Sequence, residues 1–325
     1  MKSLLLAFLL SGSLSVFAEG SLSLRTWVEK NPSLVAKESE WTLLEKGLFS
    51  KEISEDARVL KRAREFFEKE KFQEALELYE QIDKSSDHWL EAVEEKGWVY
   101  HRQKSYDKAL AQTKTLLSQA FSPIVGSEPF FLQSLSLLKV CDYKSILDTH
   151  QTFKATQRQR IIDLKELEAN GGDSSALQSV IAKVDTFPLK FSEVGEEAKS
   201  LPRLFHRDVE FQKSLLKFKL AQFAQNERAK ALALSSLTAR LKKLAQIENE
   251  ENFKIVQKLN LIEVETIQRL HADQSLDSKS YSKGKFAETN SDQLVFPDDG
   301  HPWLDELDKY QVRLNSCPQN IRRKM

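Results

Sequence analysis

The chain has few residues that break helices. Of its 325 residues, 10 are glycine and 8 are proline, whereas Leu, Lys, Glu, Ala and Gln are abundant. These abundant residues favour helices, while glycine and proline disfavour helix interiors. We therefore predict an all-α fold, with enough chain for a large core in two subregions.

An excess of charge of either sign is also missing. The 48 lysines and arginines balance 48 aspartates and glutamates. Proteins that bind nucleic acid usually carry a basic patch or stripe. The basic clusters here, Lys61-Arg62 and Arg322-Arg323-Lys324, are short. We expect them to be solvated surface, and we expect no nucleic-acid partner.

Long apolar runs are missing everywhere except at the start of the chain. There, Lys2 precedes Leu4-Leu5-Leu6-Ala7-Phe8-Leu9-Leu10, and Val16-Phe17-Ala18 resembles a cleavage site. This pattern is typical of a secretory signal peptide, here residues 1–18, and the apolar run is too short to span a bilayer. We predict a soluble protein exported to the bacterial periplasm, with no lipid anchor because no cysteine lies near the site. A retained membrane anchor is the alternative.

Signatures of catalysis and metal binding are not found. The six histidines do not pair as His-x-x-x-His or Glu-x-x-His, and two cysteines cannot build a zinc site alone. The chain lacks a Gly-x-Ser-x-Gly elbow, a phosphate-binding glycine loop and a dinucleotide-binding fingerprint. We expect no enzyme, no cofactor and no metal, although a folded pocket can assemble residues that are distant in sequence.

A period of 34 residues is the most informative feature that is present. Small and aromatic residues recur at this spacing, and each first helix is followed by a second. The matched pairs are Ala63 with Gly97, Phe66 with Tyr100, Phe72 with Tyr106, and Ala75 with Ala109. The small residues would let paired helices approach, and the aromatics would fill the space between them. We assign these eight residues to the repeat core.

This pattern resembles the tetratricopeptide repeat, in which pairs of antiparallel helices stack into a curved solenoid. The repeats would cover about 56–89, 90–123 and, more loosely, 127–157, where Ser134 takes the small position and the offset becomes 37. A generic array of helical hairpins is the alternative.

The resemblance implies a concave face lined by the first helix of each pair, and such faces bind other proteins. An aromatic residue beside charges can anchor a peptide. The residues aligned with this face are Arg64, Phe67, Glu94, Trp98, His101, Arg102 and Phe131. Alternatively, Phe67 and Trp98 pack under other helices of the same chain.

The remaining segments flank these repeats. Residues 19–55 are predicted to hold N-terminal helices, broken at Asn31-Pro32-Ser33, that form a degenerate repeat or a cap. Residues 158–271 read as helices, with a leucine seam that includes Leu234, Leu237, Leu241 and Leu244. A break at 249–252 would fold this stretch into a hairpin; otherwise the seam pairs with a second chain.

Residues 272–325 are predicted to be a polar linker and a C-terminal tail that docks on the body. The apolar anchors of the tail are Phe296, Trp303, Leu304, Leu307 and Tyr310. Export makes a disulfide between Cys141 and Cys317 plausible chemistry, and it would staple the tail to the third repeat. Two separate thiols remain the alternative.

A narrower resemblance rests on two motifs. One is Ser127-Glu128-Pro129-Phe130-Phe131-Leu132 leading to Cys141-Asp142-Tyr143, and the other is Phe296-Pro297-Asp298-Asp299-Gly300 leading to Trp303-Leu304-Asp305-Glu306-Leu307. They look like exported repeat proteins of deltaproteobacteria linked to adventurous gliding motility. The resemblance implies a non-catalytic scaffold that binds envelope proteins. The alternatives are a structural envelope protein that self-associates through the 203–271 helices, and an envelope enzyme or enzyme regulator.

Overall fold

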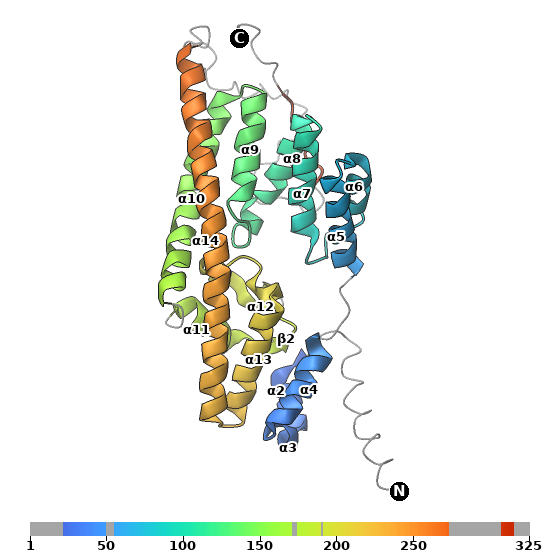
Figure 1. Ribbon diagram of the computed structural model, residues 1–325, viewed down its shortest axis with the longest axis vertical. Helices are drawn as coiled ribbons and strands as arrows, with labels where there is room; N and C mark the ends of the chain where they lie inside the picture. Colours follow the sequence, from blue (N-terminus) through green and yellow to red (C-terminus); the bar gives the residue numbers. More distant parts are fainter. Residues whose placement is uncertain (1–21, 50–54, 171–173, 190, 273–306, 315–325) are drawn as a thin grey trace, which may run out of the picture. The chain divides into compact units, whose positions relative to one another are not determined.

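The computed structural model describes residues 22–49, 55–170, 174–189, 191–272 and 307–314, and these are mostly helical (Figure 1). The predicted all-α class is therefore confirmed. The predicted signal peptide lies outside the described residues. Within the described part, no helix is both long enough and apolar enough to cross a membrane.

The chain divides into two compact units that are each discontinuous in sequence. We call Glu55–Arg158 with Asn252–Met325 the repeat unit, and Met1–Ser54 with Gln159–Glu251 the hairpin unit. Two long helices, α10 (Tyr143–Asn170) and α14 (Glu227–Ala272), contribute residues to both units. The sequence analysis did not anticipate this division, because it grouped residues by their order in the chain.

Three successive helix pairs build the repeat unit, and they match the three predicted repeats (Figure 1). The pairs are α5 (Glu55–Glu68) with α6 (Phe72–Tyr79), α7 (Trp89–Arg102) with α8 (Tyr106–Leu116), and α9 (Glu128–Lys139) with α10. A short 3₁₀ helix, η2 (Gln119–Phe121), precedes the third pair. The first helices of pairs one and two begin 34 residues apart, as do the second helices.

One turn geometry closes all three pairs. Glu70, Lys104 and Cys141 adopt left-handed backbone angles, with φ of 57°, 63° and 62°. The amide after each of them donates to the carbonyl five residues earlier, at 2.9, 2.9 and 3.1 Å. This bond is that of the Schellman motif, which ends helices and reverses the chain. The 34-residue period therefore recurs in the turns as well as in the side chains.

The predicted repeat core is confirmed for its small residues only. Ala63, Ala75, Gly97 and Ala109 are buried. A Cβ at Gly97 would lie 2.7 Å from Leu132 Cδ2, so a side chain there would force α9 away from α7. The aromatics Phe66, Phe72, Tyr100 and Tyr106 are only half-buried, because the interior is filled instead by residues such as Leu60, Tyr79, Trp89 and Val93.

The hairpin unit is built from shorter elements around α13 and the first half of α14. Its elements before α14 are β1 (Leu22–Ser23), α2 (Leu24–Lys30), α3 (Pro32–Val35), α4 (Glu38–Phe49), α11 (Ser175–Lys183), β2 (Thr186–Phe187), α12 (Phe191–Val194), η4 (Gly195–Ser200), η5 (Phe205–Arg207) and α13 (Val209–Phe223). β1 and β2 pair antiparallel, with Leu22 opposite Phe187. The N-terminal helices thus belong to this unit's core, through residues such as Trp27 and Trp41.

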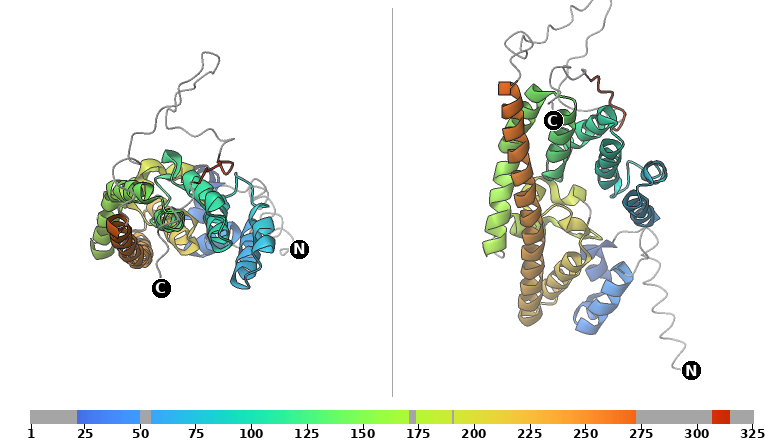
Figure 2. Two further views of the ribbon diagram at one scale, coloured as in Figure 1. Left: turned by 90° about the horizontal axis from the view of Figure 1, so that it is seen from above. Right: turned by 45° about the horizontal axis from the view of Figure 1, so that its top comes forward.

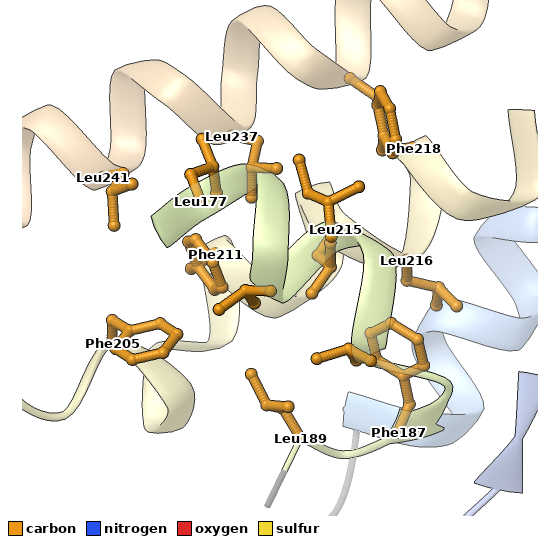
Figure 3. Close-up of a cluster of buried hydrophobic side chains, with 14 of the residues drawn as sticks. Leu177, Phe187, Leu189, Phe205, Phe211, Leu215, Leu216, Phe218, Leu237 and Leu241 are labelled. Carbon is orange, nitrogen blue, oxygen red and sulfur yellow. The ribbon is translucent and has the colours of Figure 1, made fainter. Parts of the chain in front are cut away.

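Apolar side chains from five segments meet in the core of the hairpin unit (Figure 3). Phe211 and Leu215 of α13 lie at its centre, with Leu177 of α11 and Leu237 and Leu241 of α14 above them in this view. Phe187, Leu189 and Phe205 approach from the other side. The leucine seam predicted for residues 203–271 is therefore filled within the chain, which favours the intramolecular hairpin.

The predicted break at 249–252 is wrong, because α14 runs unbroken from Glu227 to Ala272. The hairpin turns instead at Gln225, whose φ of 54° repeats the turn geometry of the repeat unit, with the next amide donating to Ala221 at 2.9 Å. Asn226 then caps α14 by accepting from the Ala229 amide at 3.0 Å. The polar residues at 249–252 are helical because they bind partners on other elements.

Candidate protein-binding face

The residues aligned with the concave face all lie on the first helices of the three pairs. Arg64 and Phe67 lie on α5, Phe131 lies on α9, and the rest lie on α7. We call this set, Arg64, Phe67, Glu94, Trp98, His101, Arg102 and Phe131, the candidate face. All seven belong to the repeat unit.

Arg64 joins α5 to α7. Its Nε donates to the two carboxylate oxygens of Glu95 at 2.9 and 3.1 Å, and the Tyr79 hydroxyl donates to the same carboxylate at 2.8 Å. The hydrogen bond to Glu95 raises the pKa of Arg64. Burial and the neighbouring Glu95 raise the pKa of Tyr79. Both side chains therefore stay protonated, and both act as donors that link neighbouring pairs.

Trp98 occupies the position of Arg64 one repeat later and makes the equivalent connection. Its Nε1 donates to Glu128 Oε1 on α9 at 2.8 Å. Its ring lies 5.7 Å from the Phe131 ring and 6.0 Å from the His101 ring, measured between centroids. Each first helix thus donates to a glutamate of the next one, and the sequence-predicted Trp98, His101 and Phe131 form one aromatic cluster.

His101 and Phe67 are also equivalent positions. The His101 ring lies 5.3 Å from Tyr106, and the Phe67 ring lies 5.9 Å from Phe72. His101 Nδ1 is 2.9 Å from Ser136 Oγ on α9. Burial lowers the pKa of His101, and nearby positive side chains lower it further, so the ring is neutral near pH 7.

The outer part of the candidate face is charged and exposed. Arg102 Nη2 lies 2.7 Å from Glu70 Oε1, and both side chains are exposed. Glu94 is half-buried. Surface ion pairs of this kind contribute little to stability. Arg102 is therefore available to exchange Glu70 for a carboxylate on a partner.

The second half of α14 covers one edge of the candidate face. Lys258 Nζ lies 4.9 Å from the Phe131 ring centroid, and Ser127 donates to Asn252 at 2.6 Å. Cation–π contacts stabilise by about 0.5–2 kcal/mol, depending on exposure. The alternative that the chain packs on its own aromatic residues thus holds for Phe131.

Sequence reasoning missed an ionic cluster beneath α14. Glu263 lies 3.5 Å from His150 Nδ1 and 3.2 Å from Lys154 Nζ, both on α10. Burial lowers the pKa of His150, and Lys154 and His150 lower the pKa of Glu263 against the opposing effect of burial. The partners are more than 100 residues apart, so no local pattern could have revealed the cluster.

The C-terminal segment 307–314 docks on the repeat unit, as predicted for Leu307 and Tyr310. Leu307 is buried and its carbonyl accepts from Lys84 Nζ at 2.8 Å. The Asp308 amide donates to Thr115 Oγ1 at 2.9 Å, and its carboxylate pairs with the buried Lys96. The remaining anchors, Phe296, Trp303 and Leu304, lie outside the described residues.

The docking position differs from the prediction in part. Lys96 lies on α7 and Thr115 on α8, so this segment holds the second helix pair. Lys114 of α8 also lies over the Tyr310 ring, 4.6 Å from its centroid. Val312 reaches the cluster around Leu137 and Cys141 of the third pair. Cys317 lies outside the described residues, so the bridge to Cys141 stays a prediction.

We expect Lys96→Met to release the docked segment. The change keeps most of the apolar volume but leaves the Asp308 carboxylate without its buried cation, which costs about 1–3 kcal/mol. Hydrogen exchange of amides 307–314 should then accelerate by roughly 10- to 100-fold. Lys61→Met, at an exposed position of α5, is the control and should leave these amides unchanged. Equal protection in both variants would contradict the role of Lys96.

Within the described residues, no three His, Cys, Asp or Glu side chains lie close enough together to hold a metal ion. Comparison with family models, with curated proteins and with solved structures finds no match to this chain. The resemblance to tetratricopeptide repeats and to gliding-motility proteins therefore stays a prediction from the residues alone.

Proposed function

We propose that the protein is a non-catalytic scaffold of the bacterial periplasm that binds another envelope protein through the candidate face. The observation that supports this best is the aromatic cluster of Trp98, His101 and Phe131, which is half-buried and lies beside the exposed Arg102. Binding sites between proteins concentrate their energy in such aromatic and arginine residues.

The chemistry of the face indicates the kind of partner. The rings of the cluster offer apolar area at little entropic cost, and Arg102 offers a planar fork for a carboxylate. An extended or helical peptide that carries an aromatic or aliphatic side chain next to an acid would fit both. A role in a gliding-motility or other envelope complex is proposed from the sequence resemblance.

Capture from crosslinked envelopes tests this function. We expect Arg102→Glu to reduce partner recovery strongly, because a central hot spot contributes about 2 kcal/mol or more, which is roughly 30-fold in Kd. Trp98→Ala combined with Arg102→Ala should abolish recovery.

The matched control is Arg62→Glu, which reverses the same charge at an exposed position of α5. Circular dichroism of each variant establishes that the helices persist. Recovery that is the same for wild type and Arg102→Glu would reject the candidate face as the binding site.

A further inference from the structure

The second half of α14 carries large apolar side chains on its outer side. Phe253, Leu261, Val264 and Ile267 are 65%, 70%, 52% and 42% exposed. With 100° between successive residues, they share one face of the helix. We call these four residues the outer stripe.

The opposite side of the same helix segment is fully used. Ile255, Leu259, Ile262 and Thr266 are buried and share the other face. α14 therefore has two apolar faces in the repeat unit, one packed within the chain and one exposed. Single exposed apolar residues are normal, but four on one helical face are typical of a docking surface.

The sequence around the outer stripe is symmetric about Asn260 in its apolar positions. Phe253 and Ile267 each lie seven residues from Asn260, and Val256 and Val264 each lie four residues away. In an antiparallel pair of identical helices centred on Asn260, each of these residues would therefore face an apolar partner. An isologous two-fold contact of this kind is the commonest in homo-oligomers.

The charges beside the stripe are antisymmetric about the same point. Lys254 lies six residues before Asn260 and Glu265 lies five residues after it. The two are eleven residues apart, which is three turns, so they lie on the same flank of the stripe. In an antiparallel two-fold pair, each flank meets its own copy. Lys254 of one chain would then face Glu265 of the other, twice.

A parallel arrangement in register lacks this complementarity. It would bring Lys254 beside its own copy and Glu265 beside its own copy, and like charges at such positions repel. The charge order thus selects both the partner, a second copy of this chain, and the direction.

We infer that the outer stripe of α14 is a homodimer interface in which two copies of α14 pack antiparallel about Asn260. This interface is separate from the candidate face and from the leucine seam that fills the hairpin unit. Stable dimers bury about 800 Å² per chain, which is more than four side chains can supply. We therefore expect a weak dimer, with a Kd on the order of 10 µM.

Analytical ultracentrifugation of the full exported chain over a concentration series tests the dimer. Leu261→Glu places a charge in the stripe at an exposed helical position and should weaken the dimer at least 30-fold. Leu232→Glu makes the same change at another exposed leucine of α14, 63% exposed and outside the stripe, and should leave the dimer intact.

A mixing experiment tests the antiparallel register. Lys254→Glu alone and Glu265→Lys alone should each weaken the dimer, because both contacts become repulsive. An equimolar mixture of the two variants should restore it, because both contacts in the mixed dimer are then attractive.

Three outcomes would overturn the inference: a monomer at all concentrations up to about 200 µM, a dimer unaffected by Leu261→Glu, or no recovery on mixing. Leu261→Glu should not change the capture that depends on Arg102. The failure of one proposal therefore leaves the other standing.

Discussion

Glu248→Leu is expected to destabilise the hairpin unit by about 3–5 kcal/mol, because it leaves a buried guanidinium without its carboxylate. Arg160 and Glu248 are both almost fully buried, and their closest atoms, Nη2 and Oε1, are 2.8 Å apart. Arg160 Nη1 also donates to the Ala198 and Lys199 carbonyls at 3.2 and 3.1 Å. Glu248 Oε2 accepts from the Arg203 amide at 2.6 Å. The pair therefore fixes α10, η4 and α14 to one another.

Urea denaturation measures this loss, and a double-mutant cycle separates the pair from its surroundings. Arg160→Met combined with Glu248→Leu should recover part of the lost stability, because two apolar side chains can replace a buried ion pair. Arg58→Met, which removes an exposed pair with Glu55, should change stability by less than about 1 kcal/mol. A Glu248→Leu protein as stable as wild type would show that water reaches the pair.

Phe211→Ala is expected to cost about 3–5 kcal/mol, the range for a buried phenylalanine that leaves a cavity. Phe211 is 0% exposed, and its ring meets the Phe205 ring edge-on, with centroids 5.2 Å apart (Figure 3). The cavity would open between α11, α13 and α14, whose continuous helices cannot collapse onto it.

Phe223→Ala is the matched control on the same helix. Phe223 is 41% exposed and lies at the last position of α13, so its loss should cost about 1 kcal/mol or less. Urea denaturation ranks the two variants, and hydrogen exchange assigns the loss to the hairpin unit. Equal destabilisation of the two variants would contradict the placement of Phe211 at the centre of this core.

The repeat unit could be predicted well from the sequence because its information is local. Ala63, Gly97 and the residues around them repeat at a fixed spacing, and so do the turns at Glu70 and Lys104. The bounds of α5 to α8 follow from that spacing, since each pair repeats the same local interactions.

The hairpin turn could not be predicted in the same way. Residues 249–252 are polar, and taken alone they indicate a loop. In the structure, Asn249 donates to the Leu164 carbonyl at 3.2 Å, and Asn252 accepts from Ser127. These partners are 85 and 125 residues away. A polar stretch is a turn signal only where no distant group satisfies it.

The candidate face was predicted in its composition but not in its pairing. Trp98, His101 and Phe131 do come together, but Arg64 is held by Glu95 and Arg102 by Glu70. Opposite charges 31 or 32 residues apart, slightly less than one repeat, are the signal that could have revealed these contacts. The C-terminal segment was found because Leu307 and Tyr310 are apolar in a polar stretch, whereas its bond to Lys96 carried no local sign.

The discontinuous units have a consequence for the order in which the chain can fold during synthesis. The N-terminal helices α2 and α4 belong to a core whose other members, Phe211, Leu237 and Leu241, are made some 160–200 residues later. The helix pairs of the repeat unit likewise lack their α14 contacts until Asn252 and Ile262 have been made. Neither unit corresponds to one contiguous stretch of chain, so no nascent fragment that ends before residue 251 can complete either of them. The first-made segments must therefore stay unfolded, or bound by a chaperone, until most of the polypeptide has been delivered.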